Sequence, residues 1–326
     1  MKGRGTGVSI APDDAVAKPD LLIGKLDKAQ ALGFDTVELP VHGMRVIVNG
    51  RLDEKRLDGY ARLLSRYPFR YAMHAPFSIN LFDPEEGAEH FALLLQSIRV
   101  CGAIGAETLV YHPGRYIAEE LLPYRNRWPC FTGEDKARLL ERERDWMREA
   151  GDAAGKLDVR IGMENMRPYL DCDDYCYSTD PALLAGQVER IAHPRVGITL
   201  DVGHLHLAMK SLPYGLEEAL TSIRPYIVHM HLHDNFGKPT FSLEKNQYDL
   251  LPVGRGDMHM PIGLGDVPMN RIARLLGAEI DGCLIHELRP MYEDEWPKLA
   301  ERLHEASFGA AVRRQPIELA GNAGGA

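Results

Sequence analysis

The chain has 326 residues, of which 45% are hydrophobic and 26% charged, and its formal net charge is −9. This composition is typical of a globular protein, and the negative charge weighs against a polyanionic nucleic acid as partner. No apolar run approaches the ~20 residues of a transmembrane helix, and the opening "MKGRGTGVSIAPDD" lacks the apolar core of a signal peptide. We therefore expect a cytoplasmic protein without a membrane partner, and the 5 scattered cysteines predict no disulfide framework.

Short apolar runs rich in β-branched residues alternate with longer helical patterns along the chain. The predicted strands are "TGVSI" near residue 8 and residues 35–40, 69–74, 108–113, 159–165, 196–201, 226–234 and 281–288. The predicted helices are residues 18–32, 53–66, 87–103, 134–153, 181–192, 213–223, 268–276 and 292–305. Apolar residues three and four apart support the helices, and prolines and glycines mark their ends.

Strict alternation of strands and helices predicts parallel strands. Eight such units in about 300 residues predict a single closed (β/α)₈ barrel, the TIM barrel of the α/β class. An open, doubly wound sheet is the alternative, although no G-x-G-x-x-G follows the first strand. We assign residues 1–310 to the barrel, with long loops after the fourth, fifth and seventh strands, and residues 311–326 to a loosely ordered C-terminal tail.

The seventh predicted strand contains the run "YIVHMHLHDN", in which His229, His231 and His233 occupy alternate positions. Side chains alternate between the two faces of a strand, so these three imidazoles point to the same side. Polar rings on an otherwise apolar strand are costly to bury without partners. We expect His231 to bind a metal ion, His233 to lie near the substrate and His229 to be structural.

Ionisable residues also stand where other predicted strands end, which is where a (β/α)₈ barrel has its active site. With the loop after the seventh strand included, they are His74, His112, Glu164, Asp201, His204, His231, Asp257, His259 and Glu287. Imidazoles and carboxylates without thiolates are typical ligands of divalent metal ions. Carboxylates that converge in a cavity repel one another unless a cation lies among them. The pattern predicts a metal centre, although any single residue could instead be a core histidine or a helix cap.

The order of the motifs resembles the xylose isomerase-like TIM-barrel superfamily from about residue 5 to 305. The segments that carry this resemblance are "MHAPFSINL", "LVYHPG", "GMENM", "GITLDVGHLH", "HMHLHDN", "DMHMPIGLGD" and "LIHEL". That superfamily includes isomerases and epimerases of sugars and sugar phosphates, and also endonuclease IV. The resemblance implies a metal-dependent enzyme, and its two branches imply different chemistry.

The isomerase and epimerase branch implies one divalent cation (Mn, Mg, Co or Zn) held by Glu164, Asp201, His231 and Glu287. Glu164 and Glu287 would move a proton at the carbon beside a carbonyl, through an enediolate that the metal stabilises. His204 would act in catalysis and, with His74, would orient substrate hydroxyls. The substrate would be a small sugar, sugar phosphate or polyol-like molecule, and the expected contacts to it are His233, Arg289, Arg115 and Asn165.

The endonuclease IV branch implies up to three zinc ions on the full set of nine strand-end residues, with in-line attack on a phosphodiester. The loop after the second predicted strand does not resemble the DNA-penetrating loop expected there, so we favour an isomerase or epimerase. A lyase or dehydratase acting on a keto-sugar through the same glutamate pair is a further alternative. Nucleic acid as a partner and a homodimer both stay open.

Overall fold

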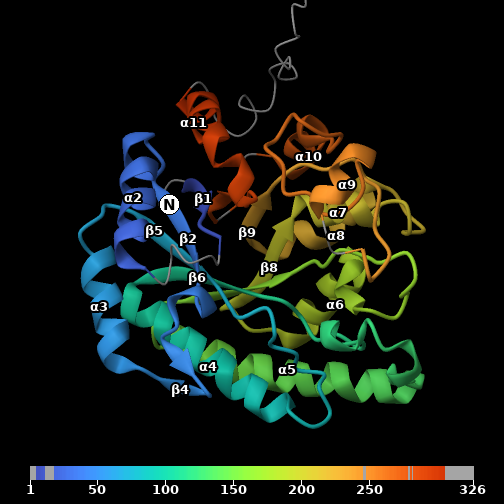
Figure 1. Cartoon of the computed structure of the whole chain (residues 1–326). Helices are drawn as coiled ribbons and strands as arrows, with labels where there is room; N and C mark the ends of the chain where they lie inside the picture. Colours follow the sequence, from blue (N-terminus) through green and yellow to red (C-terminus); the bar gives the residue numbers. More distant parts are fainter. Residues whose placement is uncertain (1–4, 12–17, 245–246, 278–279, 281, 305–326) are drawn as a thin grey trace, which may run out of the picture.

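Eight parallel strands form a closed barrel in the computed structural model, which describes residues 5–11, 18–244, 247–277, 280 and 282–304 (Figure 1). Around the barrel they follow the order β1-β10-β9-β8-β7-β6-β5-β2. Their bounds are β1 (Thr6–Ser9), β2 (Thr36–Pro40), β5 (Arg70–His74), β6 (Ala106–Tyr111), β7 (Arg160–Glu164), β8 (Val196–Asp201), β9 (Ile227–Leu232) and β10 (Leu284–His286). The predicted (β/α)₈ barrel is therefore confirmed, and the open sheet is excluded because β1 pairs with both β2 and β10.

A helix lies in each interval where the sequence predicts one. These helices are α2 (Pro19–Ala31), α3 (Glu54–Leu64), α4 (Gly87–Ile104), α5 (Gly133–Gly155), α6 (Pro181–Ile191), α8 (Leu216–Ile223), α10 (Met269–Leu276) and α11 (Trp296–His304). Two short helices were not predicted: α7 (Val202–Ala208) directly follows β8, and α9 (Gln247–Leu250) lies in the loop after β9. A small hairpin of β3 (Ile47–Val48) and β4 (Arg51–Leu52) occupies the loop after β2. Residues 311–326 lie outside the described residues.

Local sequence signals explain where several helices begin and end. The side chain of Asp180 accepts hydrogen bonds from the backbone N–H groups of Ala182 and Leu183, and Pro181 fits the first turn of α6. Thr132 and Asp135 cap α5 reciprocally. Helix α4 ends at Gly105, whose φ of 79° is accessible at low cost only without a Cβ.

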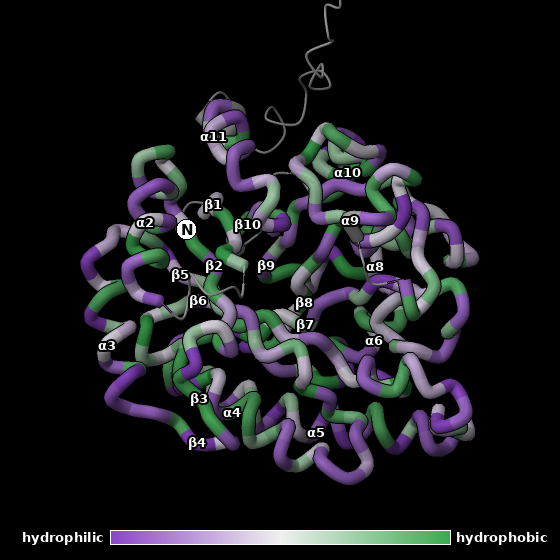
Figure 2. Tube along the Cα trace, viewed as in Figure 1, coloured by the Kyte–Doolittle hydropathy of each residue, from purple (hydrophilic) through white to green (hydrophobic). Residues whose placement is uncertain are grey.

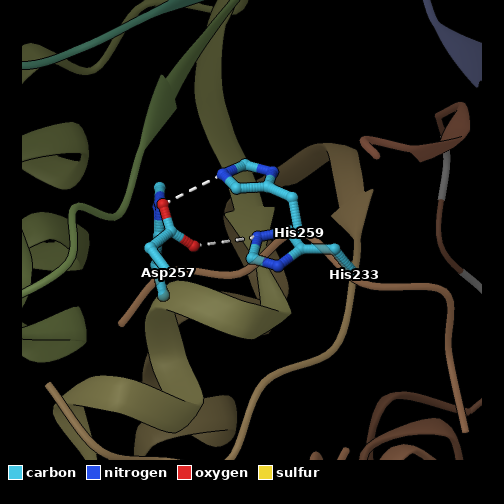
Figure 3. Close-up of side chains that lie close together, drawn as sticks. His233, Asp257 and His259 are labelled. Atoms are coloured by element: carbon cyan, nitrogen blue, oxygen red, sulfur yellow. Dashed lines mark hydrogen bonds and ion pairs between the residues drawn. The ribbon is translucent and has the colours of Figure 1, made fainter. Parts of the chain in front are cut away.

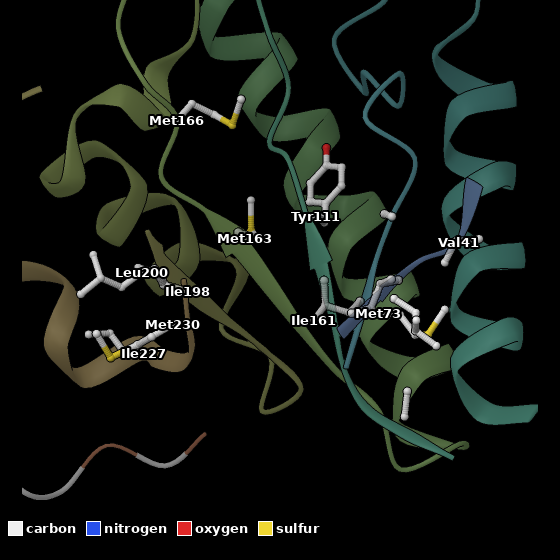
Figure 4. Packing of buried hydrophobic residues seen from close by; sticks show 14 of the residues in the cluster. Val41, Met73, Tyr111, Ile161, Met163, Met166, Ile198, Leu200, Ile227 and Met230 are labelled. Atoms are coloured by element: carbon white, nitrogen blue, oxygen red, sulfur yellow. The ribbon is translucent and has the colours of Figure 1, made fainter. Parts of the chain in front are cut away.

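The core lies between the barrel strands and the surrounding helices. Figure 2 shows hydrophobic residues gathered along the strands, and Figure 4 shows apolar side chains of neighbouring strands packed together. On β7, Ile161 and Met163 are fully buried and alternate with Gly162 and Glu164. Because side chains alternate along a strand, the apolar set faces the helices while Glu164 turns to the barrel interior. Within the described part of the chain, no helix has the length and apolar character needed to cross a membrane.

Candidate metal centre

A cavity of about 440 Å³ opens at the C-terminal ends of the barrel strands. One part of its wall is ionisable and another is apolar, which suits a small polar molecule bound beside a charged centre. The polar lining includes His74, His112, Glu119, Glu164, Arg167, His204, Asp257, His259, Glu287 and Arg289, and the apolar lining includes Ile10, Phe77 and Leu288.

The four residues expected to hold one cation converge at this mouth. They are Glu164, Asp201, His231 and Glu287, and one donor atom from each lies within 4.8 Å of the other three. His231 Nδ1 is 3.2 Å from Glu164 Oε1, 3.2 Å from Glu287 Oε2 and 3.9 Å from Asp201 Oδ2. The group draws on β7, β8, β9 and the residue after β10, so only barrel closure brings it together.

A carboxylate that the sequence did not single out, Glu38 on β2, orients His231. Its oxygens accept from Nε2 of His231, at 3.1 Å, and from Nε2 of His229, at 2.9 Å. Burial alone would raise the Glu38 pKa, but the His231 charge and the two hydrogen bonds lower it to about 2. Glu38 holds the Nε2–H of His231, so loss of a proton from this ring would leave the Nδ1 lone pair facing Glu164 and Glu287, which is the orientation a metal ligand needs.

A second group consists of His74, His112 and Glu164. Glu164 Oε2 lies 3.4 Å from His74 Nε2 and 3.0 Å from His112 Nε2. His74 donates its Nδ1–H to the carbonyl of Ala75 at 2.8 Å, which leaves Nε2 directed at the carboxylate. Burial lowers the His112 pKa to about 4, so this ring is neutral at pH 7, as a metal ligand must be. Phe77 stacks on the His112 ring with centroids 5.4 Å apart.

A third group joins His204, His233, Asp257 and His259. Asp257 Oδ2 is 3.1 Å from His204 Nε2 and 2.9 Å from His259 Nε2. Figure 3 shows Asp257 facing His259 and His233. The His233 and His259 rings stack at 4.0 Å, and His233 Nε2 is 3.0 Å from Asp201 Oδ2. The close approach of His233 requires Gly203, because a Cβ there would lie 2.0 Å from the ring.

These three groups have the composition that divalent cations require. The carboxylates of Glu164, Asp201 and Asp257 are at most 3% exposed, and such a concentration of buried negative charge needs a compensating cation. Without a metal ion, protonated histidines supply that charge. Burial lowers the pKa of His204, but Asp201 and Asp257 outweigh it and raise that pKa to about 10. The same residues, once deprotonated, could hold metal ions.

Three of the four expected substrate contacts do not line the cavity. His233 is fully buried within the third group. Arg115 is 2% exposed, and its guanidinium donates to the carbonyl of Ile79 at 3.0 Å. Asn165 exchanges two hydrogen bonds with the backbone of Asp201, at 2.9 and 2.8 Å, and so joins β7 to β8. These positions correct the expectation of direct contact, and Arg289 alone of the four lies at the cavity wall.

Sequence reasoning missed several residues at the site, among them Glu38, Phe77 and Arg167. Glu38 interrupts the apolar strand "TVELP", which is the same kind of signal as the histidines of β9. Phe77 lies in "HAPF", three residues after His74. Arg167 lies in "ENMRP", and its place follows from the path of the loop after β7, for which the sequence offers no signal.

The fold and site together define a (β/α)₈ barrel whose strand ends bear three groups of candidate cation ligands. A family model for xylose isomerase-like TIM barrels matches residues 26–307, so the chain belongs to that family.

Comparisons with known proteins find several that are similar to this chain. An uncharacterized protein of Methanocaldococcus jannaschii is 27% identical over 252 residues, which are 76% of this chain and 72% of that protein. A probable endonuclease 4 of Mesomycoplasma hyopneumoniae is 22% identical over 288 residues, 86% of this chain and 91% of that protein. The crystal structure of a D-tagatose 3-epimerase-like protein superposes with a TM-score of 0.64 at 22% identity, covering 92% of this chain and 96% of that one. That structural likeness shows the fold alone.

Proposed function

We propose that this protein is a divalent-metal-dependent isomerase or epimerase of a small sugar-like substrate. The observation that carries the proposal is the pair of carboxylates at the mouth: Glu164 and Glu287 each lie 3.2 Å from the same nitrogen of His231. Two carboxylates beside one cation position, at a cavity of about 440 Å³, suit proton transfer on a single small molecule. Similarity to an epimerase-like structure supports the same choice.

Both glutamates are ionised at neutral pH, as the base that begins this reaction must be. Burial would raise the pKa of Glu164, but His231 and His112 outweigh it and hold the pKa well below its usual range. The pKa of Glu287 is lowered as well, against burial, by His231 and His259. Both are therefore carboxylates at neutral pH, and either can accept a proton.

In the proposed reaction, one glutamate removes a proton from the carbon beside the substrate carbonyl. A bound divalent cation would polarise that carbonyl and stabilise the negative charge that develops on its oxygen. In an isomerisation, the same glutamate then returns this proton to the neighbouring carbon of the enediolate. In an epimerisation, the second glutamate takes up a proton from solvent and delivers it to the opposite face, and the first glutamate releases its proton to solvent. His204 and His74, both at the cavity wall, orient the substrate hydroxyls.

Isotope exchange tests the proposal directly. The metal-loaded protein is incubated with a panel of ketoses and ketose phosphates in deuterated water. An isomerase or epimerase incorporates deuterium beside the carbonyl, and Glu164→Gln and Glu287→Gln abolish this incorporation. Glu54→Gln, on exposed α3, is the matched control and leaves the rate unchanged. Loss of water from the product would instead indicate a dehydratase, and no exchange with any substrate would contradict the proposal.

A zinc phosphodiesterase is the second candidate, and a specific observation favours it. Glu164 is shared by two ligand groups, and a complete third group stands around Asp257, so the mouth offers places for up to three cations. Clustered metal ions suit hydrolysis of a phosphodiester. The likeness to a probable endonuclease 4 points the same way. Cleavage of a duplex with an abasic site by the zinc-loaded protein, absent in Asp257→Asn, would support this candidate over the isomerase.

A further inference from the structure

Two arginines at the cavity wall have no part in the proton transfer proposed above. Arg167 follows β7 and its side chain is 23% exposed. Its guanidinium hydrogen-bonds to the hydroxyl of Tyr169 at 3.2 Å and lies over that ring at 5.6 Å. The nearest carboxylate oxygens, of Asp257 and Glu119, are 3.7 and 3.8 Å away, which is beyond hydrogen-bond distance. Tyr169 thus holds the Arg167 guanidinium in place, while the positive charge of the guanidinium is only loosely paired with the carboxylates of Asp257 and Glu119.

Arg289 approaches from the other end of the chain, after β10. Its Nη2 donates to the backbone carbonyl of Asp257 at 3.0 Å, and its backbone N–H donates to the carbonyl of His259. The Nε–H of Arg289 is buried and has no hydrogen-bond partner among the described residues. A buried donor without an acceptor is costly, so this position favours a ligand that supplies one.

The two guanidinium groups therefore meet at one residue. The Arg167 guanidinium lies 3.7 Å from the side-chain carboxylate of Asp257, and the Arg289 guanidinium donates to the backbone carbonyl of the same residue. Both arginines line the same cavity. Asp257 also belongs to the third candidate ligand group. A cation bound there would take up the carboxylate charge that now faces Arg167, and the arginine would then be free to pair with another anion.

We propose that Arg167 and Arg289 bind an anionic oxygen group of the substrate, so that the substrate is a sugar phosphate or a sugar acid and not a neutral sugar. This inference deepens the proposed function and rests on it. Guanidinium groups match phosphate and carboxylate with paired, charge-assisted hydrogen bonds. The anionic group at this end of the cavity would hold the substrate while the carbonyl end of the substrate reaches Glu164 and Glu287. Phe77 lies at the cavity wall beside His74 and His112.

Calorimetric titration of the metal-loaded protein measures the proposed anion site without requiring turnover. The titrants are inorganic phosphate, acetate and, as a neutral control, glycerol. We expect the wild type to bind one or both anions and not glycerol. A preference for phosphate indicates a phosphate ester, and a preference for acetate indicates a sugar acid.

Variants then assign the binding to the two arginines. Arg167→Gln and Arg289→Gln should each weaken anion binding roughly 10- to 100-fold, the effect of one lost charge-assisted contact. Arg167→Lys should recover part of the affinity, because lysine keeps the charge but not the paired geometry. Arg138→Gln, on the exposed part of α5, is the matched control with unchanged affinity. Metal content is measured in every variant, so that loss of a cation is separated from loss of the arginine.

Two results would overturn the inference. One is an anion affinity within twofold of the wild type in both glutamine variants at full metal content. The other is a wild-type protein that binds neither anion. Arginine-dependent anion binding in a protein that exchanges no deuterium into any ketose would instead sustain the anion site and reject the isomerase. The two proposals therefore fail separately.

Discussion

Replacing Glu38 by glutamine tests whether a residue behind the cavity controls the candidate ligand His231. Glutamine keeps the size of the side chain but removes the charge and presents an amide N–H₂ toward imidazole donors. The carboxylate now accepts from two rings, at 3.1 Å for His231 and 2.9 Å for His229. The variant therefore disturbs the orientation of His231 without touching the cavity lining.

The size of the effect can be worked out from the Glu38 pKa shift or from the two hydrogen bonds that contribute to that shift. The Glu38 carboxyl pKa is lowered from 4.5 to about 2, because His231 and the two hydrogen bonds outweigh burial. That difference corresponds to about 3 kcal/mol in favour of the charged form. Two charge-assisted hydrogen bonds of about 1.5 kcal/mol each give a similar figure. This stabilisation is present above pH 4.5 and is lost as the pH falls through 2.

Urea unfolding of the EDTA-treated protein at pH 7 measures the loss, which we expect to be about 2–3 kcal/mol for Glu38→Gln. Competition with a chelator should show metal affinity weakened roughly 10- to 100-fold, the usual effect of removing the carboxylate behind a ligating histidine. Glu54→Gln is the control, because the Glu54 side chain is 63% exposed. Unchanged stability together with metal affinity within twofold of the wild type would refute the role assigned to Glu38.

Three further predictions concern the ligand groups. The pKa of His204 is raised from its usual 6.5 to about 10, so protonation of this ring stabilises the folded state fully below pH 6.5, and the stabilisation is lost as the pH rises through 10. Over that range, the Tm of the EDTA-treated protein should fall more steeply than the Tm of the metal-loaded protein. Gly203→Ala would place a Cβ 2.0 Å from the His233 ring and should lower the free energy of unfolding by roughly 1–3 kcal/mol, whereas Gly59→Ala, with open space around it, should not. Glu164→Gln should slow turnover at least about 100-fold for any substrate, and full activity would refute its assigned role.

The barrel could be predicted from the sequence because its signals are local and repeated. Each strand is a short apolar run, and caps such as Asp180 before Pro181 mark where helices begin. Candidate ligands could be predicted because parallel barrel strands all end at the same rim, so a residue such as Glu164 or Asp201 is placed by its strand alone. The structure brings those residues together as the rule requires.

The contacts that could not be predicted depend on how loops fold back. Arg115 was expected at the substrate because it lies in the loop after the fourth strand, but that loop pairs with Cys176 and turns the guanidinium to the carbonyl of Ile79. Arg167 shows the converse, because a loop path brings it to the cavity. Glu38 was missed for another reason: one acidic residue in a strand is ordinary until its partner across the barrel is known.

Elemental analysis of the purified protein, before and after dialysis against EDTA, tests most directly that Glu164, Asp201, His231 and Glu287 enclose a cation. We predict at least one divalent ion per chain, reduced in His231→Gln and unchanged in Glu54→Gln. A value near one favours the isomerase or epimerase, and a value near three, as zinc, favours the phosphodiesterase. Metal-free protein that takes up no divalent ion on titration would contradict the account.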